Sequence, residues 1–260
     1  MIRPRFAFLD HPGPIPFAHR GGALEQFENT WKSFSHARDL GYRYLETDVN
    51  ASADGVALAI HDPFLHRVTD RQGLVREMTW SQLSSIRLEG DEPIPRLDDL
   101  LAAWSDVRWN IDIKHDTAVD PVIETLRRTD AIERVCITSF SDRRLARVRG
   151  ALGPTVCTAL GPAAVGSLRF ASVLPPRAAT PVIAPLVRFG AAQVPVRQGW
   201  MPLIDSRFVR TAHRARLHVH VWTVNDETTM TRLLDLGVDG IMTDRPTVLK
   251  RVLEGRRQWA

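Results

Sequence analysis

The chain has 260 residues, of which 44% are hydrophobic and 25% are charged. These fractions are typical of a globular protein and exclude a disordered, collagen-like or coiled-coil chain. Lys and Arg number 34 against 30 Asp and Glu, a formal charge of +4 that favours anionic partners without identifying one. A chain of this length can bury a core without disulfides, and we expect one barrel-sized domain over residues 1–260.

The sequence predicts no nucleic-acid motif, signal peptide or membrane span. Basic residues are locally dense only in 250–257, which we interpret as the exposed face of a last helix. The opening apolar run, 6–9, is too short for a signal peptide, and the stretch 182–196 is too short and too broken to cross a bilayer. Cys136 and Cys157 lie in apolar segments and are expected to be buried thiols. We therefore expect a soluble, cytoplasmic protein. The sequence does not indicate how many subunits assemble.

Short strand-like runs alternate with helical patterns along most of the chain. Strands are expected at residues 15–20, 44–50, 56–62, 109–114, 134–140, 154–160, 191–196, 218–224 and 240–244. Helices fit at residues 30–40, 121–129, 141–149, 205–216, 226–236 and 247–254. If 56–62 extends the second strand, eight βα units remain. They predict a closed (β/α)8 TIM barrel with its active site at the carboxyl ends of the strands.

Two segments break this rhythm. Residues 63–95 are interpreted as a small insertion after the second strand, and the proline-rich segment 171–185 as a loop or short irregular helix. An open doubly wound sheet is the alternative fold, but no glycine-rich phosphate fingerprint follows the first strand.

Charged residues stand where two of the strands should be apolar. Side chains alternate along a strand, so Glu46 and Asp48 share one face, and Asp112 and Lys114 share one face of the third strand. Three carboxylates converging in a barrel mouth would repel one another, and a bound Mg²⁺ or Ca²⁺ is the simplest explanation. The alternative is that Lys114 merely pairs with a carboxylate in the barrel interior.

Two histidines stand at strand ends. His19 ends the first strand before Arg20-Gly21-Gly22, and His61 ends the run 56–62. One such histidine is usually structural, but two near the same end of a barrel indicate proton transfer. His220 shares strand parity with Trp222 and could also enter the mouth.

Taken together, these residues resemble the glycerophosphodiester phosphodiesterase family. The resemblance is carried, in the family's order, by A-H-R-G-G (18–22), F-E-N-T (27–30), L-E-T-D-V (45–49), D-G-V-A-L-A-I-H-D (54–62), H-R-V-T-D (66–70), I-D-I-K (111–114), T-S-F (138–140), Q-V-P (193–195), V-W-T-V-N (221–225) and G-I-M-T-D-R-P (240–246). Each motif is weak by itself, but the ordered set spans nearly the whole chain and is specific.

The resemblance implies a TIM-barrel enzyme that hydrolyses small glycerophosphodiesters to glycerol 3-phosphate and an alcohol. It places one divalent cation, Mg²⁺ or Ca²⁺, on Glu46, Asp48 and Asp112. The family usually has Glu at the third position, so the shorter Asp112 puts the affinity and identity of the metal in question. Glu28 and Asn29 precede the first helix, and we interpret Asn29 as its cap and Glu28 as an outer contact of the site.

The resemblance also assigns roles in the reaction. His19 and His61 form the acid–base pair, and Arg20 and Lys114 lie near the phosphate. The glycerol 2-hydroxyl attacks first, and water then opens the cyclic phosphate. We assign His19 as the base and His61 as the acid, with the reverse assignment open. Trp222 is expected to form an apolar wall against the glycerol or the head group, or else to pack in the core.

Two other functions stay open from the sequence. The same machinery could act on lysophospholipids as a lysophospholipase D, with an apolar mouth built from Phe64, Leu65 and Trp80 of the insertion. A catalytically silent phosphodiester-binding protein is the other alternative, although pure binding does not require a pair of histidines.

Overall fold

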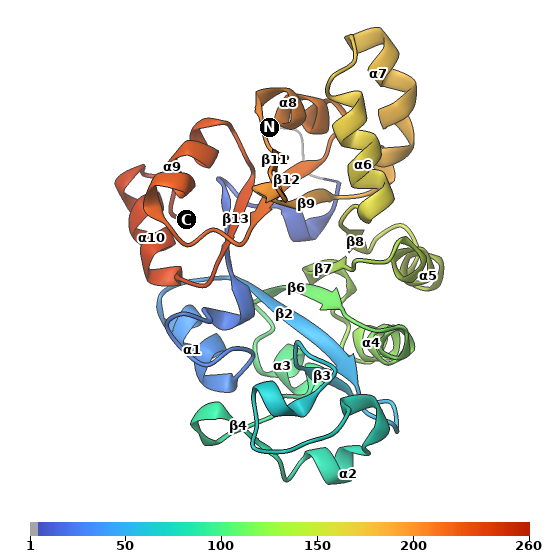
Figure 1. Cartoon of the computed structure of the whole chain (residues 1–260), viewed down its shortest axis with the longest axis vertical. Coiled ribbons are helices and arrows are strands. Elements are labelled where there is room, and N and C mark those ends of the chain that lie inside the picture. The colour runs from blue at the N-terminus through green and yellow to red at the C-terminus, as the bar shows by residue number, and fades with distance from the viewer. Residues whose placement is uncertain (1–4) are drawn as a thin grey trace.

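The fold is an eight-stranded parallel barrel surrounded by helices (Figure 1). The structure, a computed structural model, describes residues 5–260. The barrel strands are β1 (Ile15–Ala18), β2 (Tyr44–Ala51), β6 (Arg108–Ile113), β7 (Val135–Thr138), β8 (Cys157–Thr158), β9 (Ala191–Pro195), β12 (His218–Trp222) and β13 (Gly240–Thr243). Neighbouring strands follow the order β8-β7-β6-β2-β1-β13-β12-β9, and a bridge between Ala159 and Ala191 joins the two ends. The predicted TIM barrel is confirmed.

Helices cover the outer face of the barrel because their apolar sides pack on the outward residues of the strands. They are α1 (Trp31–Asp39), α3 (Leu97–Ala103), α4 (Val119–Arg128), α5 (Asp142–Leu152), α6 (Pro162–Ala171), α7 (Pro176–Ile183), α8 (Ser206–Arg214), α9 (Glu227–Asp235) and α10 (Pro246–Gly255). Outward Leu45 and Val49 of β2, for example, belong to one apolar cluster with Phe34 of α1. The proline-rich segment is the irregular helix of the two alternatives, because α7 contains Pro181 in its interior.

The strand after β2 runs antiparallel to it, whereas the sequence interpretation treated it as an extension of β2. Residues 56–62 do not extend β2, because β3 (Ala57–Ala59) turns back and pairs with it antiparallel, Val49 opposite Ala59. The five-residue turn between them, 52–56, with Gly55 at φ +81°, permits this reversal. The insertion then forms α2 (Trp80–Leu83) and the short ribbon of β4 (Arg87–Leu88) and β5 (Glu92–Pro93). It has its own small apolar cluster beside the barrel.

The interior of the barrel is layered from apolar to charged. At the amino ends of the strands, Phe8 from the N-terminal segment packs with Phe17 and Tyr44, and buried free Cys136 and Cys157 belong to the same cluster. Next to this apolar plug, buried Gln193 contacts Asn110 and His220 in a neutral polar layer. The charged side chains lie at the carboxyl ends of the strands. No helix in residues 5–260 is both long and apolar enough to cross a membrane.

Candidate active site

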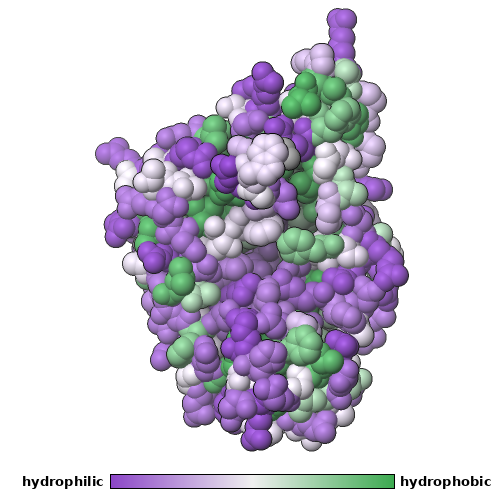
Figure 2. Space-filling model, viewed as in Figure 1, coloured by the Kyte–Doolittle hydropathy of each residue, from purple (hydrophilic) through white to green (hydrophobic). Residues whose placement is uncertain are grey.

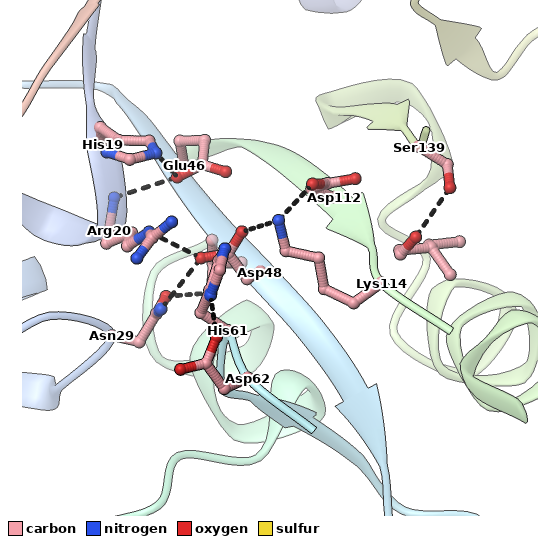
Figure 3. A network of polar contacts seen from close by, with 12 residues as sticks. His19, Arg20, Asn29, Glu46, Asp48, His61, Asp62, Asp112, Lys114 and Ser139 are labelled. Atoms are coloured by element: carbon pink, nitrogen blue, oxygen red, sulfur yellow. Dashed lines mark hydrogen bonds and ion pairs between the residues drawn. The ribbon is translucent and has the colours of Figure 1, made fainter. Parts of the chain in front are cut away.

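A row of buried carboxylates crosses the barrel mouth on β2 and β6. Glu46, Asp48 and Asp112 are 4%, 1% and 5% exposed, and Asp48 stands directly opposite Asp112 in the parallel register. Their inward direction is the one that the strand alternation predicts. Figure 3 shows Lys114 reaching between the two aspartates, 2.8 Å from Asp48 Oδ1 and 2.6 Å from Asp112 Oδ2. Lys114 therefore pairs with two carboxylates, not one.

Arg20 holds the other end of this row. Its backbone N–H donates to Glu46 Oε2 at 3.0 Å, and its Nε lies 2.9 Å from Asp48 Oδ2 as an ion pair. The turn that aims Arg20 has φ +52° at Arg20 and φ +80° at Gly21. A Cβ on Gly21 would lie 2.4 Å from Ser33 Oγ, so only glycine fits at that position.

The carboxylates carry more negative charge than these two cations balance. Burial and then Asp48 raise the pKa of Glu46 to about 7. Burial also raises the pKa of Asp112, although Lys114 opposes the rise. At Asp48 burial acts in the same direction, but Lys114 and Arg20 outweigh it and lower the pKa. An additional cation at this row would therefore be stabilised.

His19 is held by a carboxylate from the other end of the chain. Its Nδ1 lies 2.6 Å from Asp244 Oδ1, and its Nε2 lies 3.8 Å from Glu46 Oε2. Asp244 is itself fixed by Asn225, whose Nδ2 donates to Asp244 Oδ2 at 2.9 Å. Burial alone would lower the pKa of His19, but Glu46 and Asp244 together raise it. Sequence reasoning missed Asp244 and Asn225. The available signal was that Asp244 follows the eighth strand, which neighbours the first in a closed barrel.

His61 reaches the mouth from the antiparallel strand β3. Asn50 Nδ2 donates to the carbonyl of His61 at 3.1 Å and anchors this segment to β2. His61 Nδ1 lies 2.6 Å from Asp62 Oδ1, and Asp62 pairs with Arg67. Burial lowers the pKa of His61, and Lys114 adds to the effect. In Figure 3 His61 lies beside Asp48. Both histidines thus have Nδ1 engaged by a carboxylate.

Asn29 has a different role from the one the sequence indicated. Thr30, not Asn29, caps α1, since its side chain accepts from the N–H of Ser33. Asn29 is 2% exposed, accepts from Thr47 Oγ1 at 2.8 Å and donates from Nδ2 to Asp48 Oδ2 at 3.2 Å. It therefore positions a carboxylate of the site.

The expected outer contact at Glu28 is present. Glu28 Oε2 accepts from Arg20 Nη1 at 3.0 Å, and its other oxygen pairs with Arg67 at 2.5 Å. Because Arg67 also pairs with Asp62, these contacts link the Arg20 side of the mouth to His61.

A cavity of about 610 Å³ opens over this row, within the range of small-molecule sites. All eight predicted site residues line it: His19, Arg20, Glu46, Asp48, His61, Asp112, Lys114 and Trp222. The ring of Trp222 packs edge-on against exposed Phe140, with centroids 5.8 Å apart. Trp222 is thus part of an apolar wall of the cavity.

The predicted apolar mouth from the insertion is wrong. Phe64, Leu65 and Trp80 do not line the cavity, and Leu65 is fully buried in the insertion's own cluster. The apolar lining comes from the opposite side of the barrel, including Leu160 and Val165.

The donor chemistry of the row fits a hard divalent cation. Its three carboxylates offer only oxygen ligands, and Asp112 Oδ1 is buried without a hydrogen-bond partner. In residues 5–260, however, no three His, Cys, Asp or Glu side chains already form a metal-holding group. Lys114 Nζ lies between two of the predicted ligands, so a cation that uses both requires this ammonium to shift.

The fold is that of a TIM-barrel protein, and its charged cavity lies at the carboxyl ends of the strands, where enzymes of this fold have their active sites. A sequence model of the glycerophosphoryl diester phosphodiesterase family matches residues 19–248. "Probable glycerophosphodiester phosphodiesterase 2" of Mycobacterium tuberculosis is 38% identical over 257 residues, 98% of this chain and 97% of the relative. The chain therefore belongs to the glycerophosphoryl diester phosphodiesterase family, and it is an enzyme of that class.

Two more distant relatives extend the comparison. A lysophospholipase D of Rattus norvegicus is 26% identical over 268 residues, 91% of this chain and 85% of the relative. The structure of an Oleispira antarctica phosphodiesterase in complex with the product sn-glycerol-3-phosphate matches with a TM-score of 0.75. That match covers 93% of this chain and 97% of the other at 22% identity, and it supports the fold alone.

Proposed function

We propose that this chain hydrolyses glycerophosphodiesters to glycerol 3-phosphate and an alcohol with the help of one divalent cation. The observation that carries the proposal is that two carboxylate-held histidines and a row of carboxylates and cations line one cavity. Members of the family generally depend on a divalent metal. Glu46, Asp48 and Asp112 would hold it, as Mg²⁺ or Ca²⁺. When bound, it would neutralise charge on the phosphoryl oxygens.

The chain's own residues supply binding and proton transfer. Arg20 and Lys114 attract the phosphodiester by charge and hydrogen bonding. The glycerol 2-hydroxyl attacks phosphorus, one histidine takes its proton, and the phosphorus–oxygen bond to the head group breaks. The other histidine gives a proton to the departing alkoxide, and water then opens the cyclic phosphate. Asp244 and Asp62 orient the two rings by fixing Nδ1, so that Nε2 is the atom that exchanges the proton.

We assign His19 as the base and His61 as the acid. Without a bound cation, the pKa shifts favour the opposite roles. Glu46 raises the pKa of His19, which favours a protonated ring, and burial lowers the pKa of His61, which favours a neutral ring. A cation at Glu46 would weaken the first effect. The assignment is tested with a p-nitrophenyl ester of glycerol 3-phosphate, whose leaving group needs no acid. His61→Ala should regain most of its lost turnover on this ester, and His19→Ala should not; the opposite result reverses the roles.

The central experiment measures glycerol 3-phosphate release from glycerophosphocholine. EDTA should abolish release, and Mg²⁺ or Ca²⁺ should restore it. Full activity in a verified metal-free preparation refutes the metal requirement, whereas binding of the diester without any release indicates the catalytically silent alternative.

A second candidate substrate class is favoured by the cavity wall. Phe140, Leu160, Val165 and Trp222 present apolar surface beside the site, which could accept the acyl chain of a lysophospholipid. A lysophospholipase D activity would appear as release of the head-group alcohol and a lysophosphatidic acid. Comparing kcat/KM for glycerophosphocholine and lysophosphatidylcholine separates the two.

A further inference from the structure

The two halves of the cavity differ in charge. The half formed by β1, β2, β3 and β6 carries the three carboxylates, the two cationic side chains and both histidines of the site. The opposite half, from β7 to β13 with α6 and the β10–β11 ribbon (Arg197–Gln198, Met201–Pro202), is neutral or apolar with one exception. Arg169 of α6 is the only charged side chain lining that half among the described residues. Figure 2 shows the contrast: hydrophobic surface gathers over α6 and α7, while the surface over β2 and β6 is hydrophilic.

The closed ring sets the position of Arg169. Helix α6 follows β8, the fifth barrel strand, and in a ring of eight the fifth strand lies across from the first. Val165 and Gly166 line the cavity as well, and Arg169 is one helical turn further along the same face. Arg169 therefore lies on the wall of the cavity across from β1.

The guanidinium of Arg169 is only partly satisfied by the protein. Its Nη1 donates to Ser172 Oγ at 2.6 Å, and its Nη2 lies 3.5 Å from Asp205 Oδ2. Its Nε is buried and has no hydrogen-bond partner in residues 5–260. Asp205 is itself engaged as the cap of α8, accepting from the N–H groups of Arg207 and Phe208. A cation placed beside apolar walls with spare donors is costly unless a ligand completes it.

The segment of the sequence around Arg169 is also basic. Residues 162–216 contain eight arginines and no lysine, against a single acid, Asp205. The basic excess of the chain therefore lies entirely in this part, and the remainder carries a net negative charge. This charge acts on anions only at long range, because Arg169 is the one arginine of the segment that lines the cavity.

We propose that this half of the cavity is a subsite for an anionic leaving group, with Arg169 as the residue that selects it. The inference rests on the proposed function, which places the glycerol phosphate at the carboxylate–cation row and directs the leaving alcohol across the mouth. The planar fork of a guanidinium matches a carboxylate or a phosphate in two hydrogen bonds. An ammonium head group would instead be repelled by Arg169, so glycerophosphocholine should be hydrolysed more slowly than a diester with an anionic leaving group.

The test uses three esters of sn-glycerol 3-phosphate that differ only at the end of the leaving group: 3-carboxypropyl, propyl and 3-aminopropyl. Glycerol 3-phosphate release gives kcat and KM for each. The wild type should prefer the carboxypropyl to the aminopropyl ester by about 10-fold or more in kcat/KM, as expected for one charge-assisted hydrogen bond. Arg169→Gln should remove most of this preference, and Arg169→Lys should retain part of it.

Two further variants separate selection from structure. Arg177→Gln removes an exposed arginine of α7 that does not line the cavity, and its preference should equal that of the wild type. Asp205→Asn keeps an oxygen to cap α8 but removes the negative charge beside Arg169, so the preference should increase. This second variant tests the idea even if Arg169→Gln fails to fold.

The outcomes distinguish the two proposals. Hydrolysis of none of the esters refutes the proposed function and the subsite with it. Hydrolysis of all three at equal kcat/KM, or a preference that Arg169→Gln and Asp205→Asn leave unchanged, refutes the subsite while the activity stands.

Discussion

The stability of this protein should fall in mild acid because of one buried histidine, His220. It is fully buried in the barrel interior, and burial, with a smaller contribution from His218, lowers its pKa to about 3. The contacts require a neutral ring: Gln193 Nε2 lies 2.7 Å from Asn110 Oδ1 and 3.3 Å from His220 Nδ1, so Nδ1 accepts. A proton on Nδ1 would set two donors against each other.

The sign and size of the effect follow from linkage. The pKa of His220 is depressed in the folded protein, from 6.5 in the unfolded chain to about 3. Between pH 6.5 and about 3, His220 is protonated in the unfolded chain but neutral in the folded protein. The contribution to stability is therefore complete above pH 6.5 and is lost as the pH falls toward 3. Each pH unit is worth about 1.4 kcal/mol, so the two pH units between 6.5 and 4.5 correspond to a loss of about 3 kcal/mol.

Urea unfolding followed by circular dichroism at pH 7.5, 5.5 and 4.5 measures this loss. Between pH 7.5 and 4.5, His220→Gln should lose about 2–3 kcal/mol less unfolding free energy than the wild type. His213→Gln is the control of opposite sign. The hydrogen bond to Asp239 raises the pKa of His213, so that residue stabilises the protein below pH 6.5 and ceases to do so as the pH rises through its folded value.

Parallel stability curves for the wild type and His220→Gln would refute the reasoning. An independent check is the NMR titration of the His220 ring, which should show no protonation down to pH 4.5 in the folded protein. A midpoint near 6.5 contradicts a neutral buried ring, whatever the stability of the variant.

Three further outcomes concern the reaction. Asp244→Asn should lower kcat by about 100-fold or more and lower the pKa of His19, because a carboxylate that orients the ring and stabilises its protonated form is lost. Unchanged kcat together with an unchanged NMR titration of His19 contradicts this role. Asp112→Asn should weaken metal binding in a calorimetric titration, while Asp112→Glu should preserve it. An unchanged titration for Asp112→Asn means that Asp112 serves only to pair with Lys114. A 2-deoxyglycerol analogue should inhibit competitively and turn over negligibly, since an internal hydroxyl can reach an effective molarity of up to about 10⁸ M; turnover at a comparable kcat would decide for direct attack by water.

Local backbone geometry explains why much of the site was predictable. The two-residue period of a strand places Glu46 and Asp48 on one face in any fold that makes this segment a strand. The same argument holds for Asp112 and Lys114. Alternation of strands and helices predicts parallel pairing, and parallel strands bring their carboxyl ends to one edge. The convergence of these side chains with His19 therefore needed no tertiary information beyond the closure of the barrel.

Tertiary structure decided the partners and the opposite wall. Asp244 contacts His19, 225 residues away in the sequence, because the last strand pairs with the first. The spacing of residues within a strand or helix does not predict such a contact. Asn29 could be assigned as a cap or as a support of Asp48 only once the turn before α1 was placed. The insertion residues Phe64 and Leu65 are apolar enough to line a mouth, but Leu65 is buried in the insertion's own cluster and Phe64 is exposed outside the cavity. The sequence thus determined which side chains share a face, whereas ring closure determined what each of them faces, because side-chain direction is a local property of the backbone and proximity is a property of the whole chain.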